Sequence, residues 1–138
     1  MKKTIFKTLI AMLFLTMLGN DAVSQPLFGY TPSEVRSEFP NASWTYDKWG
    51  DNKDMLMMSY STQTFEVSYL FNQNNKSVFT SISPTKQGTL QYLIETYNNR
   101  YVIISNTKWK LYKGGSIFVC ELLQKNDGSY FFFWTLEE

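Results

Sequence analysis

The chain has 138 residues, with 13 lysines and arginines, 12 aspartates and glutamates, no histidine and a single cysteine. This near-neutral balance excludes a basic nucleic-acid-binding surface, because neutralisation of phosphates dominates affinity for nucleic acid. The absence of histidine excludes Ser-His and Cys-His catalysis and histidine-ligated metal sites. The content of 11 Phe, 9 Tyr and 4 Trp favours strands over a helical bundle.

The first 24 residues have the features of a bacterial export signal. Lys2, Lys3 and Lys7 form a positive start, and the mostly apolar run over residues 5–18 is too short for a membrane-spanning helix next to a globular domain. The small-x-small pattern ending at Ser24 predicts cleavage before Gln25; the alternative is an uncut membrane anchor. We expect a signal peptide over residues 1–24 and a single exported domain over residues 25–138. This domain would be periplasmic or secreted, with no stable membrane insertion after cleavage.

Cys120 is the only cysteine, so an intramolecular disulfide cannot form. It lies in an apolar run that is typical of a strand. A nucleophilic role would need an activating base, and the chain has no histidine to supply one. We expect Cys120 to be a small buried apolar side chain.

In chain order, the first expected element is a short helix after Thr31. Thr31 can cap it, Pro32 suits the first helical position, and Glu34 can complete a capping box. Pro40 would end the helix just after Phe39. An irregular stretch over residues 41–54 is expected next, followed by strands over residues 55–60, 64–72 and 77–83. The middle strand carries the clearest alternation, with apolar residues at every second position from Phe65 to Phe71.

A second expected helix begins near Ser83-Pro84-Thr85. Its apolar residues follow the spacing of one helical face, namely Leu90, Leu93, Ile94 and Tyr97. Extended runs follow over residues 101–105, 108–113, 116–124 and 129–135. The predicted fold class is α+β, with two tandem α-β-β-β units over residues 27–83 and 84–136. The units would share one antiparallel sheet with the helices on one face, because short connections favour hairpins.

The first unit also carries a recognisable pattern, namely a glycine and a threonine before the helix, a valine in it, a proline after it, and a Phe-Asn pair before a turn. These residues are Gly29, Thr31, Val35, Pro40, Phe71 and Asn72. Over roughly residues 27–83 the pattern resembles the helix-plus-three-strand module of small outer-membrane lipoproteins of the SmpA/OmlA type. Two such modules in tandem resemble the β-lactamase-inhibitor-protein-like fold. The resemblance implies this architecture and a bias towards protein–protein contact.

The aromatic segment over residues 44–54 is one candidate binding site. Trp44, Tyr46 and Trp49 have the content of a loop that stacks on a sugar or a peptide. The alternative is that these rings pack as a lid over the core. The oxygen-rich residues 47–54 do not have the spacing of an EF-hand loop, and two lysines compete for the carboxylates. We therefore expect no metal and no cofactor.

The terminal strand is the second candidate site. Tyr130, Phe132 and Trp134 share one face of this strand, and its other face is also apolar. Because the helices would cover the opposite face of the sheet, we expect these three rings on its open face, where they would form an interface. The alternative is that the segment from Trp44 to Trp49 folds over them.

These features predict an exported, non-catalytic binding module that takes a protein or peptide on the open sheet face; it could also form an oligomer. One alternative is small-ligand or glycan binding through the aromatic segment, which would need a cleft with convergent polar groups. Another is a hydrolase that uses a carboxylate pair. Its candidate residues are Asp47, Asp51, Asp54, Glu66, Glu95 and Glu121.

Overall fold

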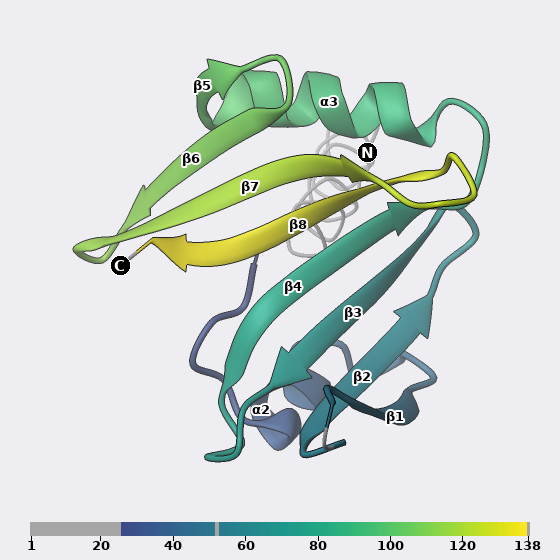
Figure 1. Cartoon of the computed structure of the whole chain (residues 1–138), viewed down its shortest axis with the longest axis vertical. Helices are drawn as coiled ribbons and strands as arrows, with labels where there is room; N and C mark the ends of the chain where they lie inside the picture. Colours follow the sequence, from purple (N-terminus) through teal and green to yellow (C-terminus); the bar gives the residue numbers. More distant parts are fainter. Residues whose placement is uncertain (1–25, 52, 138) are drawn as a thin grey trace, which may run out of the picture.

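The computed structural model describes residues 26–51 and 53–137, so the signal peptide expected over residues 1–24 lies outside the described residues. The described chain is α+β, with two helices and one eight-stranded antiparallel sheet (Figure 1). The elements are α2 (Pro32–Glu38), β1 (Thr45–Trp49), β2 (Met55–Ser61), β3 (Phe65–Phe71), β4 (Ser77–Pro84), α3 (Thr89–Arg100), β5 (Val102–Ser105), β6 (Lys108–Lys113), β7 (Ser116–Gln124) and β8 (Tyr130–Glu137).

The strand order is β1-β2-β3-β4-β8-β7-β6-β5, and each pair of neighbours is antiparallel. Each helix precedes four strands, and the two sets of four meet where β4 pairs with β8. The prediction of α-β-β-β units was therefore wrong, although the four extended runs expected after the second helix match β5–β8. Strand β1 was missed because Thr45–Trp49 has no alternation of apolar and polar residues. Its extended conformation is stabilised by pairing with β2.

The predicted cap of α2 is confirmed. The Glu34 N–H donates to the Thr31 hydroxyl at 3.2 Å, and the Thr31 N–H donates to the Glu34 carboxylate at 2.7 Å. Pro32 occupies the first turn, and the helix ends at Glu38, two residues before Pro40. These hydrogen bonds satisfy donors that a helix N-terminus leaves without intrahelical partners.

The second helix, α3, begins later than the sequence predicted. Strand β4 continues to Pro84, and the chain then turns at Gly88, whose φ of 88° favours glycine. The predicted helical face is confirmed, because Leu93 and Tyr97 are buried while Leu90 and Ile94 pack against the core.

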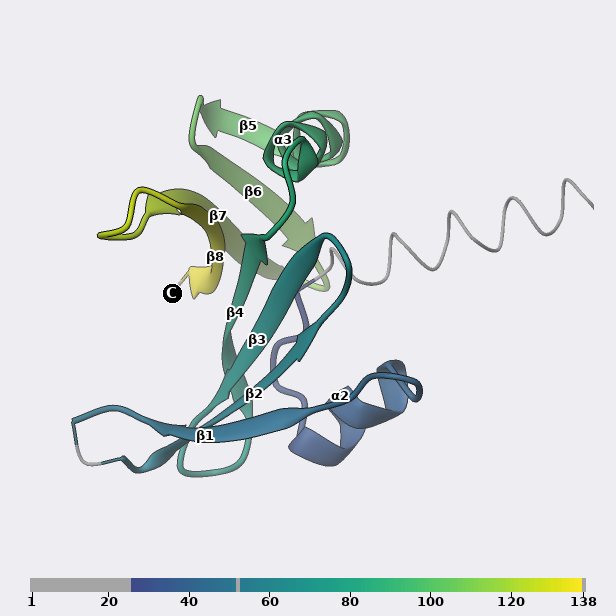
Figure 2. The same ribbon diagram turned by 90° about the vertical axis from the view of Figure 1, so that its right-hand side faces the viewer.

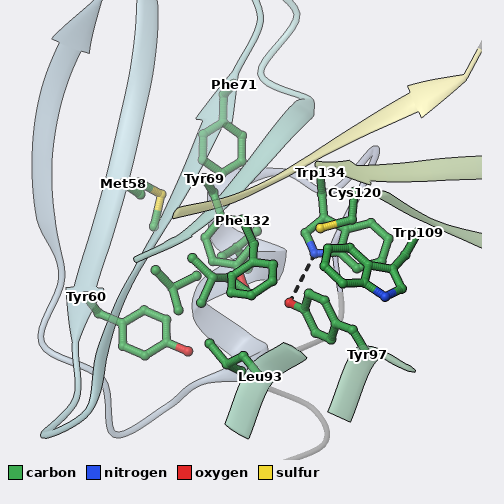
Figure 3. Close-up of a cluster of buried hydrophobic side chains, with 13 residues drawn as sticks. Met58, Tyr60, Tyr69, Phe71, Leu93, Tyr97, Trp109, Cys120, Phe132 and Trp134 are labelled. Carbon is green, nitrogen blue, oxygen red and sulfur yellow. Dashed lines mark hydrogen bonds between the residues drawn. The ribbon is translucent and has the colours of Figure 1, made fainter. Parts of the chain in front are cut away.

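The core lies against one face of the sheet, which we call the core face. Alternate residues of β3 lie on it with no exposed surface, namely Val67, Tyr69 and Phe71. One buried cluster joins them to Val35 of α2 and to Leu93 and Tyr97 of α3 (Figure 3). The predicted burial of Cys120 is also confirmed, and burial raises the pKa of its thiol.

The predicted placement of the terminal strand was wrong. Trp134 pairs with Thr80 and Phe132 with Ile82, and these two residues of β4 lie opposite Tyr69 and Val67. Paired residues share a face, so Phe132 and Trp134 lie on the core face, with no exposed surface. Alternation showed that these rings share a face, but only the pairing of β8 with β4 determines which face it is.

Helix α3 supplies the partner for these rings. The Tyr97 ring centroid lies 4.8 Å from that of Phe132 and 5.6 Å from that of Trp134, both in edge-to-face geometry. The Trp134 indole N–H donates to the Tyr97 hydroxyl at 3.3 Å (Figure 3). Phe132 and Trp134 therefore belong to the core.

Candidate functional site

The opposite face of the sheet, which we call the open face, carries the residues that alternate with the core positions. The register of β3, β4 and β8 brings together six of them, namely Ser68, Leu70, Phe79, Ser81, Phe131 and Phe133. Leu70 lies opposite Phe79, and Ser68, Ser81 and Phe133 form one row across the three strands. Four apolar side chains of the open face, from Leu70, Phe79, Phe131 and Phe133, thus meet near the centre of the sheet.

These residues line a groove of about 490 Å³. Its apolar walls are formed by Trp49, Met57, Leu70, Phe79, Phe131 and Phe133. Its polar residues are Glu66, Ser68, Ser81, Ser83 and Lys125. The volume falls within the range of about 300–1,000 Å³ that is typical of ligand pockets.

Two hairpins supply the ends of the groove. Trp49 comes from the β1–β2 hairpin and Lys125 from the turn between β7 and β8. Figure 2 shows both hairpins reaching away from the side on which α2 and α3 lie. The chain turns after Trp49 at Gly50, with a φ of 100°, and a Cβ there would lie 3.2 Å from the Asp54 carboxylate. Gly50 thus allows the tight turn that places Trp49 at the groove.

The aromatic walls hold one another in position. Phe79 and Phe133 stack with ring centroids 5.2 Å apart, and Phe131 lies edge-to-face with Phe133 at 6.3 Å. The Lys125 ammonium lies 5.6 Å from the Phe131 centroid, within the range of a cation–π contact. Side chains fixed in this way lose little conformational freedom when a ligand binds.

The polar groups of the groove come from β3, β4 and the turn between β7 and β8. The hydroxyls of Ser59 and Ser68 are hydrogen-bonded at 2.7 Å. Lys125 donates to the Ser83 hydroxyl at 3.3 Å, and within the described ranges no carboxylate lies at ion-pair distance from it. Lys125 therefore keeps hydrogen-bonding capacity for a ligand, because an ammonium has three donors.

The rest of the open face differs in character. On β6, Lys108 pairs with Glu121 at 3.1 Å and Lys110 pairs with Glu137 at 2.9 Å. The hydrogen bond that Lys110 donates to the Glu137 carboxylate raises the pKa of Lys110. These cross-strand ion pairs give the β6–β7 side of the face charged groups that the groove walls lack.

The three aromatic residues of the segment over residues 44–54 do not converge. Trp44 packs edge-to-face on Tyr60, with centroids 4.8 Å apart, as the lid interpretation predicts. Tyr46 is exposed, and its hydroxyl accepts a hydrogen bond from Arg36 at 3.2 Å. Only Trp49 lines the groove, with 53% of its surface exposed. Pairing of β1 with β2 explains this separation, because Tyr46 and Trp49 fall on opposite faces.

Tyr130 also lies away from the groove. It is exposed and borders a separate hollow beside the start of α3, with Leu90 and Gly88. The predicted site omitted Phe131 and Phe133, the neighbours of Phe132 on the other face of β8. The sequence showed both apolar faces of the strand, so only the choice of face was wrong.

The six carboxylates considered for a hydrolytic pair do not come together in one site. Of the six, only Glu66 lines the groove. Glu121 pairs with Lys108, Asp54 accepts from Gln73 at 2.8 Å, and Glu95 accepts from Gln91 at 3.1 Å. Among the described residues, no group of three or more acidic, cysteine or histidine side chains could hold a metal ion.

Searches among protein-family models, curated proteins and solved structures find no match to this chain. Over residues 26–51 and 53–137, no helix is long and apolar enough to cross a membrane. A functional hypothesis therefore depends on the geometry of the groove.

Proposed function

We propose that this chain is an exported, non-catalytic binding module that holds a segment of a protein or peptide in the open-face groove. The observation that carries the proposal is the groove of about 490 Å³, walled by aromatic and aliphatic side chains and edged by serines, Glu66 and Lys125. Apolar walls with a small number of hydrogen-bonding groups are the usual composition of a binding site.

The partner would be recognised through its side chains. The strands that line the groove are paired on both sides, except β1 at the sheet edge. Their backbone N–H and C=O groups are therefore already used and cannot pair with an added strand. One partner side chain of the size of Leu or Phe would seat between Leu70 and the Phe79–Phe133 stack. Complete burial of such a side chain contributes about 1.5–3 kcal/mol, enough for an anchor residue.

We also propose an architecture and a location for the module. The chain would consist of two units of one helix and four strands, with both helices on the core face, so that the open face is left for a partner. The resemblance to tandem SmpA/OmlA-type modules, which have three strands after each helix, stays part of the proposal only in its bias towards protein contact. The module would act in the periplasm or outside the cell as a single domain over residues 25–138.

A peptide library provides the test. Linear peptides would be selected on the purified chain, and their affinities measured by fluorescence anisotropy for the wild type and for Ser81→Arg. Ser81 lies on the groove floor between Ser68 and Phe133, so arginine fills the groove while little packing is removed. We expect selected peptides to carry an aromatic or aliphatic anchor and to lose at least tenfold in affinity for the variant.

The control is the same change at Ser116, a strand residue outside the groove lining. Ser116→Arg should keep wild-type affinity, and circular dichroism should show that both variants are folded. Peptides that bind Ser81→Arg as tightly as the wild type would contradict the proposal.

A small ligand with an apolar face is a second candidate, favoured by Trp49. Its exposed indole borders a groove that also holds three serine hydroxyls and an ammonium group, which suits a sugar ring stacked on an aromatic face. Binding on a glycan array that is lost in Trp49→Ala and kept in Tyr46→Ala would support this candidate. Equal binding by both variants would count against it.

A further inference from the structure

The outer strand β5 presents a continuous apolar edge. Val102, Ile103 and Ile104 are consecutive and are 50%, 55% and 48% exposed. The strand order places β5 at the end of the sheet, paired only with β6 among the described strands. An exposed apolar edge strand is a template for pairing with another chain, because its outward N–H and C=O groups lack ladder partners.

The other edge strand of the sheet, β1, carries charged residues that disfavour self-pairing. Strand β1 carries Asp47 and Lys48 at its centre, and all five of its residues are exposed. If β1 paired antiparallel with β1 of a second copy around a two-fold axis at Asp47 or Lys48, the residue on the axis would face the same residue of the other chain. Like charges directly opposite each other are destabilising. Charged edges of this kind are a known protection against pairing, and β5 carries no charge between Val102 and Ser105.

We propose that β5 pairs antiparallel with β5 of a second copy of this chain, around a two-fold axis at Ile103. In this register Ile103 lies opposite Ile103 of the second copy, and Val102 lies opposite Ile104. Every central pair is therefore apolar on both sides. The nearest charged residues, Arg100 and Lys108, lie outside the strand, so the register sets no like charges against each other. The strand is thus complementary to itself in shape and charge.

The interface is small, so the dimer is weak. β5 has four residues, and the register with β6 shifts between Ile103 and Ser105, which limits the length of a regular ladder. Stable interfaces bury about 800 Å² on each partner, more than four residues supply, so we expect a dissociation constant on the order of 0.1–1 mM.

Two double variants, changed at the same two positions but differing in charge, test the register. Val102→Lys combined with Ile104→Glu places opposite charges across the axis, whereas Val102→Lys combined with Ile104→Lys places like charges there. Sedimentation velocity at low ionic strength, from 10 µM to 1 mM chain, should show wild-type self-association. The first variant should retain it within about threefold, and the second should lose it at least tenfold.

A third variant, Ile103→Lys, sets like charges together on the axis and should also be monomeric. The matched control is Tyr92→Lys on α3, since Tyr92 is 57% exposed and lies on neither edge strand, and it should associate like the wild type. A monomeric wild type at 1 mM would overturn the proposal. Equal behaviour of the Lys/Glu and Lys/Lys variants would overturn the register and with it the two-fold pairing.

Discussion

Neighbouring residues of β8 should respond very differently to truncation, because they lie on opposite faces of the sheet. Phe132 has no exposed surface and packs against Tyr97 at 4.8 Å and Trp109 at 5.8 Å between ring centroids. Phe133 is half-buried, and its main ring contact is the Phe79 stack. Both changes, Phe132→Ala and Phe133→Ala, remove the same atoms from the same strand.

The magnitudes follow from burial. Truncation of a buried phenylalanine costs about 3–5 kcal/mol, because the lost transfer free energy adds to the cost of the cavity. Phe133→Ala should cost about 1–2 kcal/mol, since its ring is partly solvated and loses one stacked neighbour. Typical domains are stable by only about 5–15 kcal/mol, so the first change removes a large part of the total.

Urea unfolding followed by circular dichroism measures both changes. The midpoint should fall much further for Phe132→Ala than for Phe133→Ala, with similar slopes. If Phe132→Ala does not fold, Phe132→Leu keeps most of the volume and should still lose more stability than Phe133→Leu. Equal losses for the two positions, or a larger loss at Phe133, would refute the assignment of faces.

Three further predictions concern α2 and the buried hydroxyls. Thr31→Ala should lower the free energy of unfolding by about 0.5–2 kcal/mol, because the Glu34 N–H loses its acceptor; a thermal melt without change would contradict the cap. Tyr69→Phe should leave stability unchanged or raise it by up to about 1 kcal/mol, because the buried Tyr69 hydroxyl has no hydrogen-bond partner among the described residues, and a clear loss in urea unfolding would contradict this. Burial raises the pKa of Tyr60, Tyr69 and Tyr97, so their folded-state pKa values lie above the unfolded value of about 10. Their contribution to stability is then full below about pH 10 and decreases as the pH rises from there towards the folded-state values, so a melting temperature that does not fall between pH 9 and 11 would contradict this.

Local sequence signals predicted the helices and most of the strands. The capping box at Thr31 and the helical spacing of Leu93 and Tyr97 depend on neighbouring residues, so they are readable without tertiary information. Strand β1 was missed because its five residues carry no alternating pattern and become extended through pairing with β2.

The candidate site depended on long-range pairing, which the sequence does not specify. An open apolar face was expected, but Phe132 and Trp134 were assigned to it in place of Phe131 and Phe133. A one-residue change of register moves a whole strand pattern to the other face. The contact between β8 and β4 joins residues about 50 positions apart, and no local pattern indicates it. Trp49 was assigned to a binding surface, and it lines the groove.

The central claim, that the open-face groove is a binding surface, is tested most directly by a nitrogen-15 NMR titration of the chain with the tightest selected peptide. The perturbed amides should cluster on the strands that line the groove, around Ser68, Ser81 and Phe133. Ile103 on β5 and Tyr130 beside α3 should shift little. Perturbations centred on β5 or on Tyr130, with the groove amides unchanged, would contradict the claim.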